Sequence, residues 1–183
     1  MIIGLSGTLA SGKDTVAEYL KKNEGFGHIS LSAILRGILE KEGTNVNLEN
    51  LTRIGNSLRK KYGGDFLVKK AKKKVDFSSN LVVSSIRQEG EVRALRKEKN
   101  FYMIFVDADP KIRFNRLIKR GRAGDTNDFK KFIGTEKKQL GGTAGGMNLN
   151  VCKKMSDFLI INNGKLEEFE KKIKDTILTI KAR

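Results

Sequence analysis

The chain has 183 residues, of which 38% are hydrophobic and 32% charged, as expected for one domain with a buried core rather than a disordered protein. Its formal net charge of +16 attracts polyanions, whether nucleotides, nucleic acid or an anionic membrane surface. A single cysteine, Cys152, and a single histidine, His28, exclude a disulfide framework, a zinc cluster and a Ser-His-Asp triad. Without a signal sequence or an apolar run near the ~18 residues of a membrane span, we expect a cytoplasmic protein with no membrane partner.

Short apolar runs predict the strands, at 1–5, 26–31, 81–86, 101–106 and 158–162. Their continuous hydrophobicity is typical of strands buried on both faces of a parallel sheet. Helical patterns occupy 13–23, 32–42, 47–74 (as two helices), 89–98, 110–120, about 128–140, and 165–181. The alternation predicts an α/β fold, a three-layer α/β/α sandwich around a five-stranded parallel sheet.

We expect a single domain over residues 1–183. Within it, helices at about 32–75 are predicted to bind an acceptor. The segment 121–150 is rich in glycine and polar residues, and 141–150 has no periodicity. Such a segment in a compact α/β domain is usually functional, and we predict that it forms a lid that closes to exclude water.

A glycine-rich loop, GTLASGK at residues 7–13, fits the pattern G-x-x-x-x-G-K between a predicted strand and a predicted helix. Its backbone N–H groups can surround phosphates, and the helix N-terminus adds partial positive charge. Lys13 is expected to reach the β- and γ-phosphates of ATP or GTP. The loop therefore predicts that the α/β fold is that of a P-loop NTPase. The predicted nucleotide-binding residues here are Gly7, Leu9, Ala10, Ser11, Gly12, Lys13, Asp14 and Thr15.

Asp14 occupies the position where such loops usually carry a hydroxyl residue that binds Mg²⁺. A carboxylate is also a hard oxygen ligand, so we predict Mg²⁺ as the cofactor and Asp14 as its ligand, directly or through water. Alternatively, Asp14 only stabilises the first turn of the helix. Thr15 is then placed to hydrogen-bond the α-phosphate.

The stretch GKDT resembles the loop of phage deoxynucleoside monophosphate kinases, and phosphomevalonate kinases of the animal type also carry GKD. The resemblance extends over most of the chain to the P-loop nucleoside monophosphate kinases, adenylate kinases among them, and to the related dephospho-CoA kinases. It implies an ATP-dependent kinase with a lid.

On the acceptor side, HISLSAILR at residues 28–36 is similar to the H-I-S-x-G-D-x-L-R stretch of adenylate kinases. The resemblance implies that Arg36 holds the acceptor phosphate, and it places Ser32 in the same site, although serine and alanine replace the glycine and aspartate of the pattern. A planar guanidinium suits a phosphate. His28 is either a packed strand-end residue or, less simply, a catalyst.

Arg87 follows the predicted strand 81–86, at the edge where open α/β sheets bind ligands. The family places a phosphate-binding arginine there, often with an acidic residue shortly before it that organises Mg²⁺. Here 83–86 contain no carboxylate. Asp14 is a candidate for the compensating carboxylate.

The helix predicted at 110–120 carries Arg113, Arg116 and Arg120 at a spacing that places them on one face. It resembles the kinase helix that leads into the lid. The resemblance implies that Arg116 lies over the adenine and that Arg120 reaches the transferring phosphates, with Arg122 as a third candidate. The alternative is a solvated basic surface.

Near the end of the chain, SDFLIINNGKLEEF is similar to a segment of dephospho-CoA kinases. The resemblance implies a loop near the adenine formed by Asn162, Asn163 and Gly164.

The acceptor decides whether a base is needed, since a phosphate is already a nucleophile and a sugar hydroxyl requires a carboxylate. Dephospho-CoA kinases carry D-x-D after the second strand, where this chain has Ser30-Leu31-Ser32. We therefore expect transfer of the γ-phosphate of ATP to a (deoxy)nucleoside monophosphate, with Lys13, Arg87 and Arg120 as catalytic residues.

The sequence is also compatible with other functions. They are a dephospho-CoA kinase or another small-molecule P-loop kinase, phosphomevalonate kinase included, and a P-loop ATPase acting in RNA or ribosome assembly. Nucleic acid is a conceivable partner but not the favoured one, because no RNA-binding module is recognised. The expected state is a monomer or a homodimer.

Overall fold

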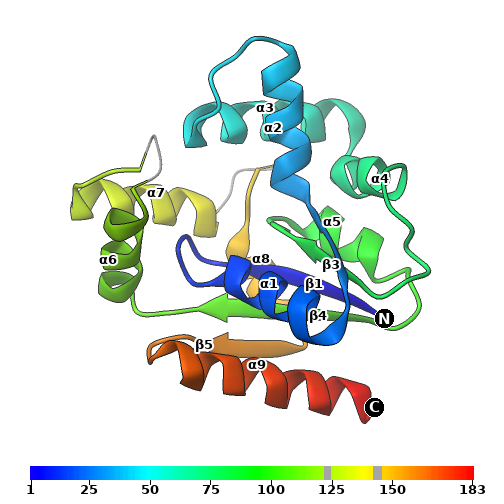
Figure 1. Ribbon diagram of the computed structural model, residues 1–183. Helices are drawn as coiled ribbons and strands as arrows, with labels where there is room; N and C mark the ends of the chain where they lie inside the picture. Colours follow the sequence, from blue (N-terminus) through cyan, green and yellow to red (C-terminus); the bar gives the residue numbers. More distant parts are fainter. Residues whose placement is uncertain (122–124, 142–145) are drawn as a thin grey trace.

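A parallel β-sheet forms the centre of the computed structural model, which describes residues 1–121, 125–141 and 146–183 (Figure 1). Its five strands have the order β2-β3-β1-β4-β5 and pair in parallel. The strands are β1 Ile2–Gly7, β2 Gly27–Ser30, β3 Leu81–Ser84, β4 Phe101–Asp107 and β5 Phe158–Ile161. The predicted fold class is confirmed, and the carboxyl ends of β1 to β4 meet at one edge.

Helices cover both faces of the sheet, so the molecule has three layers (Figure 1). Within the described residues they are α1 Lys13–Glu24, α2 Leu31–Lys41, α3 Leu48–Tyr62, α4 Phe66–Lys72, α5 Glu89–Leu95, α6 Pro110–Arg120, α7 Phe129–Gly141, α8 Leu149–Lys154 and α9 Leu166–Lys181. Because side chains alternate along a strand, β1 sends Ile2 to a core shared with α2 to α5 and α8. Ile3 points to the opposite core, formed with α1 and α9.

Helix α8 was not expected from the sequence. Its six residues are too few to show a helical period, but Leu149 and Cys152 lie one turn apart and are both buried in the core. Asn148 caps the helix by accepting a hydrogen bond from the Val151 N–H at 3.1 Å. The Asn148 N–H in turn donates to the carbonyl of Arg87 at 2.7 Å, which links this helix to a predicted site residue.

Part of the predicted lid falls in 122–124 and 142–145, outside the described residues, as does Arg122. The described part of 121–150 contains α7, which packs beside α6. The division into a core, acceptor-binding helices and a lid therefore stays a prediction. In the ranges that the structure describes, no helix is both long and apolar enough to cross a membrane.

Candidate functional site

The glycine-rich loop joins β1 to α1 at the carboxyl edge of the sheet. Gly7 has φ 147° and Gly12 has φ 107°, and a Cβ atom at Gly7 would lie 2.1 Å from the carbonyl oxygen of Val106. Both conformations favour glycine. Since Gly12 is the N-cap of α1 and has no side chain to cap it, the N–H groups of the first turn are available to an anion.

Lys13 lies across this loop and is half-buried. Its Nζ donates to the carbonyl of Thr8 at 2.6 Å. Burial, reinforced by the positive charge of Arg87, lowers the pKa of Lys13 to about 7. Burial thus disfavours the charged form of the loop's own lysine, and a bound polyphosphate would restore that charge.

Nucleotide binding should therefore take up a proton above neutral pH. At about pH 8 most Lys13 is neutral in the free protein, because its pKa is about 7, and binding should protonate it, so that affinity falls by up to about tenfold per pH unit above 7. Isothermal titration of ATP in buffers of different ionisation enthalpy measures the uptake. Lys13→Arg, which stays charged, is the control that should show none, and an equal uptake in both proteins would contradict the assignment.

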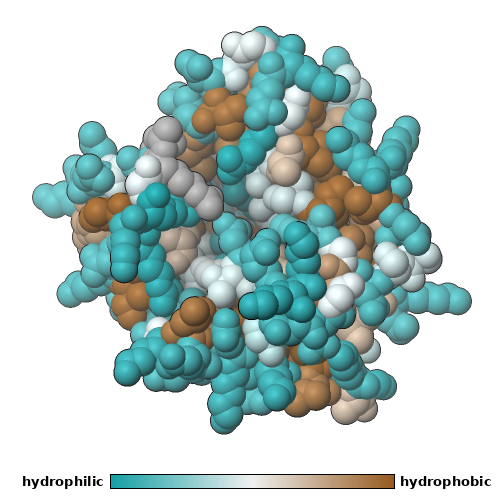
Figure 2. Space-filling model, viewed as in Figure 1, coloured by the Kyte–Doolittle hydropathy of each residue, from teal (hydrophilic) through white to brown (hydrophobic). Residues whose placement is uncertain are grey.

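A cleft of about 1000 Å³ opens in front of the loop and is hollowed into the face shown in Figure 2. It brings together most of the predicted site residues, namely Leu9, Ala10, Ser11, Gly12, Lys13, Asp14, Thr15, Ser32, Arg36, Arg87, Arg116 and Arg120. Four arginines from α2, the end of β3 and α6 thus face one space together with Lys13. Gly7, Asn162 and Gly164 do not line it.

A buried ion pair between Arg59 and Glu91 contacts the backbone of Arg87. Oε1 of Glu91, a fully buried residue, accepts from Nε and Nη2 of Arg59 at 3.0 and 2.9 Å. Its other oxygen accepts from the backbone N–H of Arg87 at 2.8 Å. Burial and the neighbouring charge of Arg59 lower the pKa of the Arg87 guanidinium. One carboxylate from α5 therefore ties α3 to the backbone that presents Arg87.

Hydroxyl groups occupy the ends of β2 and β3, where they line the cleft. The Oγ atoms of Ser30, Ser32 and Ser85 form a triangle with sides of 3.0, 3.1 and 3.2 Å. Ser85 adopts φ 64°, an uncommon conformation for serine. His28 Nε2 lies 2.8 Å from Ser84 Oγ, and burial lowers the pKa of this histidine, so it is a hydrogen-bonded residue beside the triangle.

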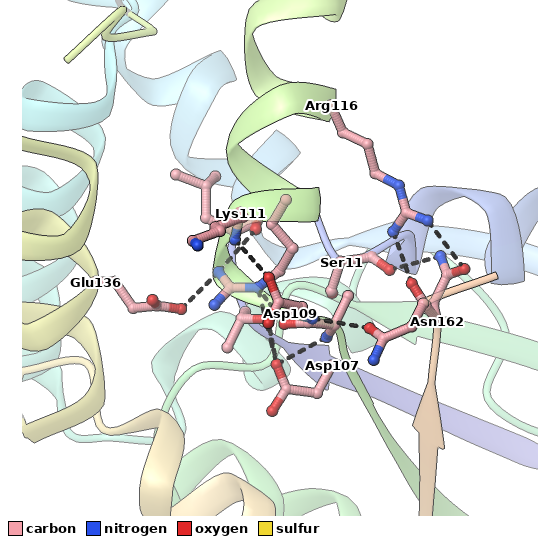
Figure 3. A network of polar contacts seen from close by, with 12 residues as sticks. Ser11, Asp107, Asp109, Lys111, Arg116, Glu136 and Asn162 are labelled. Atoms are coloured by element: carbon pink, nitrogen blue, oxygen red, sulfur yellow. Dashed lines mark hydrogen bonds and ion pairs between the residues drawn. The ribbon is translucent and has the colours of Figure 1, made fainter. Parts of the chain in front are cut away.

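Figure 3 shows how Asn162 joins three segments behind the loop. Its side-chain amide donates to the carbonyl of Ser11 at 2.9 Å, and its backbone N–H donates to the carbonyl of Asp107 at 2.8 Å. Arg116 donates to the backbone and side-chain oxygens of Asn162 at 3.0 and 3.3 Å. Asn162 is therefore placed to support the loop, while Arg116 also lines the cleft.

Arg113 is buried. It therefore does not belong to a solvent-exposed basic surface, which is the alternative interpretation of the arginine spacing on α6. Its Nη1 lies 2.6 Å from Oε1 of Glu136 on α7 and 3.3 Å from the carbonyl of Leu9 in the loop. Its Nε donates to the carbonyl of Ala108 at 2.7 Å. Arg113 therefore connects the loop, the end of β4 and helix α7.

Arg120 is held by Asp125, and both residues line the cleft. Its Nε and Nη2 donate to the two carboxylate oxygens at 2.8 and 2.9 Å. To reach a phosphate, Arg120 must exchange one anion for another. The pair is a candidate latch between the end of α6 and the chain that leads to α7.

Asp125→Asn should therefore tighten ATP binding by about three- to tenfold, since Arg120 no longer has to leave a carboxylate. Equilibrium binding of a fluorescent ATP analogue measures the change. In an Arg120→Ala background the same substitution should have no effect. An unchanged Kd for Asp125→Asn in the native background would rule out the latch.

The side chains that line the cleft suit a divalent cation that is held jointly by a carboxylate and by nucleotide phosphates. In the part of the chain that the structure describes, no group of three or more His, Cys, Asp or Glu side chains could hold a metal. Mg²⁺ is commonly held by one or two carboxylates plus substrate phosphates. Asp14 is exposed and lines the cleft beside Lys13, so its donor chemistry fits this arrangement.

A second cavity of about 1210 Å³ lies between α3 and α7. Asn47 and Leu48 line both spaces, so the second cavity adjoins the cleft at the start of α3. The side-chain oxygen of Asn56 is buried there without a hydrogen-bond partner.

Sequence reasoning assigned no role to Glu91, Arg59, Asp107 or Asp125. Asp107 accepts from the hydroxyl of Thr8 at 2.8 Å and from Lys153 at 3.0 Å. Its position directly after a buried strand is a signal that could have found it. The other three depend on partners 5 to 32 residues away, and no local motif marks them.

A glycine-rich loop between β1 and α1, at the edge of a parallel sheet of order 2-3-1-4-5, defines a P-loop protein of the kinase-like type. Residues 3–134 match the family model of an AAA domain. A UPF0200 protein of Thermococcus gammatolerans is 32% identical over 184 residues, which cover 97% of this chain and 94% of the relative. A UPF0200 protein of Thermococcus kodakarensis is 30% identical, with 97% and 96% covered. The chain therefore belongs to the UPF0200 family and carries an AAA domain.

Solved structures with the same fold include two shikimate kinases. The enzyme of Acinetobacter baumannii, solved in complex with shikimate, has a TM-score of 0.62 and 14% identity over 100% of this chain and 95% of its own. The enzyme of Aquifex aeolicus has a TM-score of 0.57 and 17% identity, with 98% and 97% covered. At these identities the likeness concerns the fold. Family and fold together support a nucleotide-binding P-loop.

Proposed function

We propose that the protein is an ATP-dependent phosphotransferase that moves the γ-phosphate of ATP to a (deoxy)nucleoside monophosphate. The observation that carries this proposal is the shared cleft. The loop with Lys13 lies on one side, and Arg36 and Arg87 face the same space from the acceptor side. Two phosphate-binding regions that open onto one cavity suit a transfer between phosphates.

The triangle of serines favours a phosphate over a sugar hydroxyl as the acceptor. Among the described residues, the carboxylates that line the cleft are Asp14 and Glu18 on α1 and Asp125 opposite Arg120, and none belongs to β2 or β3. Serine hydroxyl groups can donate hydrogen bonds to an acceptor phosphate, but at neutral pH they cannot act as the general base that a sugar hydroxyl acceptor requires. A dephospho-CoA kinase activity, which needs such a base, is therefore the less favoured alternative.

The residues then have distinct roles in this proposal. Lys13 and the first-turn N–H groups hold the donor phosphates, and Arg36 with Ser32 and Arg87 holds the acceptor phosphate. Arg120, once released from Asp125, neutralises charge on the group in transfer. Arg116 borders the donor end of the cleft. Bound Mg²⁺ supplies charge neutralisation at the phosphates, with Asp14 as its protein ligand.

Asp14→Asn tests the assignment of Asp14. It should raise the Mg²⁺ concentration needed for half-maximal turnover by about tenfold, because the amide is neutral and a weaker ligand for a hard cation. Glu18→Gln, on the same helix and lining the same cleft, is the matched control and should change it by less than about twofold. Equal Mg²⁺ titrations for the two variants would contradict the role of Asp14.

The proposed function is tested by Mg²⁺·ATP consumption and product identity against a panel. The panel contains each ribo- and deoxynucleoside monophosphate, dephospho-CoA, phosphomevalonate and a reaction without acceptor, with Lys13→Ala as the control. The expected result is a Lys13-dependent nucleoside diphosphate from one or a few monophosphates. Turnover with dephospho-CoA alone, or slow hydrolysis indifferent to every acceptor, would overturn the proposal.

A further inference from the structure

Positive charge is concentrated where α3 ends and α4 follows. Residues 60–74 contain seven lysines and one carboxylate, whereas 165–181, which cover the lysine-rich α9, contain five lysines and four carboxylates. The seven lysines are all exposed. Ion pairs within the described residues engage Lys69 with Asp65 and Lys72 with Glu98. This corner, residues 60–74, therefore keeps most of its charge, while α9 is nearly neutral.

Aromatic rings lie among these lysines. Tyr62 and Phe66 stack with ring centroids 5.0 Å apart and planes inclined by 21°. Lys61 lies 5.1 Å from the centroid of Tyr62, and Lys70 lies 5.5 Å from that of Phe66. Figure 2 shows apolar surface at the place of α4, bordered by hydrophilic residues. The corner thus combines cations with flat apolar rings.

The stacked pair also has a structural explanation, since it spans the turn between α3 and α4. Stabilising this turn requires contact between the two rings, but it does not require the ring of Tyr62 to be exposed. Tyr62 is 49% exposed, so about half of this residue remains accessible to solvent. A tyrosine ring beside ammonium groups is the surface on which an unpaired base can stack while phosphates meet the lysines.

We propose that the corner at residues 60–74 binds single-stranded nucleic acid, with Tyr62 as the stacking platform and the surrounding lysines as phosphate contacts. The corner lies within the helices at about 32–75 that the sequence predicts to bind an acceptor, but only the start of α3 reaches the cleft in front of the glycine-rich loop, and no residue of 60–74 lines it. The surface is therefore separate from the proposed phosphotransfer site. Helix α3 begins at that cleft and ends at this corner. Single strands are favoured over duplexes because only unpaired bases expose a face for stacking.

The test measures fluorescence anisotropy of a labelled single strand of about twelve nucleotides, oligo(U) and oligo(dT), between about 50 and 200 mM salt. The charge variant is Lys61→Gln/Lys70→Gln. Its matched control is Lys171→Gln/Lys174→Gln, which removes the same charge from exposed positions on α9. The stacking variant is Tyr62→Ala, with Tyr62→Phe as the control that keeps a ring.

The charge variant should bind about tenfold more weakly and reduce the salt slope by about 1.4, whereas the α9 control should change affinity by less than about twofold. Tyr62→Ala should bind about fivefold or more weakly, and Tyr62→Phe about as well as the native protein. Phosphotransfer should be unchanged in all four variants, so failure here is distinguishable from failure of the proposed function.

Several results would overturn the proposal. Equal losses in the two lysine variants would indicate a diffuse positive field rather than a local surface. Unchanged binding by Tyr62→Ala would show that Tyr62 is not a stacking platform. Equal affinity for a duplex would show that the corner does not prefer single strands. Binding to phosphatidylserine vesicles that depends on Lys61 and Lys70, without binding to the oligonucleotides, would assign the corner to a membrane instead.

Discussion

Lys13→Ala is expected to lower kcat/KM for ATP-dependent phosphotransfer by about a thousandfold, because it removes the loop's own positive charge from the donor phosphates. Nothing else in the described loop carries positive charge, and the neighbouring arginines come from other elements. Coupled-enzyme kinetics with the acceptor identified by the panel measures the effect.

Two further variants make this result specific. Lys21→Ala, in the exposed last turn of the same helix, should keep activity within about twofold of the native value. Lys13→Arg keeps the charge but changes its geometry, and it should recover binding more than turnover. If Lys13→Ala retained more than about a tenth of native activity, the loop would not be the phosphate-binding element of this reaction.

Glu91→Gln is expected to destabilise the fold by about 3–5 kcal/mol, because it leaves the Arg59 guanidinium buried without an anion. Arg59 is 4% exposed and Glu91 is fully buried. Urea unfolding followed by circular dichroism measures the loss. Glu89→Gln is the matched control, since Glu89 makes an exposed ion pair with Arg93 on the same helix, and it should cost less than about 1 kcal/mol.

The double variant Arg59→Leu/Glu91→Gln separates stability from positioning. Removing both charges should recover much of the lost stability, while the glutamine oxygen can still accept from the backbone N–H of Arg87. Activity should then return with stability if Glu91 acts on Arg87 through that hydrogen bond. A Glu91→Gln variant no less stable than Glu89→Gln would show that the buried pair does not hold α3 and α5 together.

The strands and the loop were predictable because their signals are local. Apolar runs such as 101–106 need no partner to be recognised, and the spacing of Gly7, Gly12 and Lys13 is contained in seven residues. Helix α8 could not be found in this way. Its stability comes from burying Leu149 and Cys152 in the core, and core burial is a property of the fold rather than of a six-residue segment.

The sequence predicted the positions of some arginines better than those of others. Arg36, Arg87, Arg116 and Arg120 do line one cleft, as the edge of a parallel sheet leads one to expect. Arg113 shares the helical face of Arg116 and Arg120 in sequence, yet it is buried against Glu136. Helical spacing specifies a direction around the axis, and only packing decides whether that direction meets solvent, a cleft or another helix.

By itself the sequence determined the α/β class, the phosphate-binding loop, its lysine and the basic character of the chain, because each depends on residues close together along the chain. The tertiary structure alone decided which charges are neutralised. It pairs Arg59 with Glu91 and Arg120 with Asp125, and it leaves most lysines of the corner at 60–74 without an acidic partner among the described residues. The physical reason is that burial and distance set the strength of a charge, and both arise only when segments far apart in sequence come together.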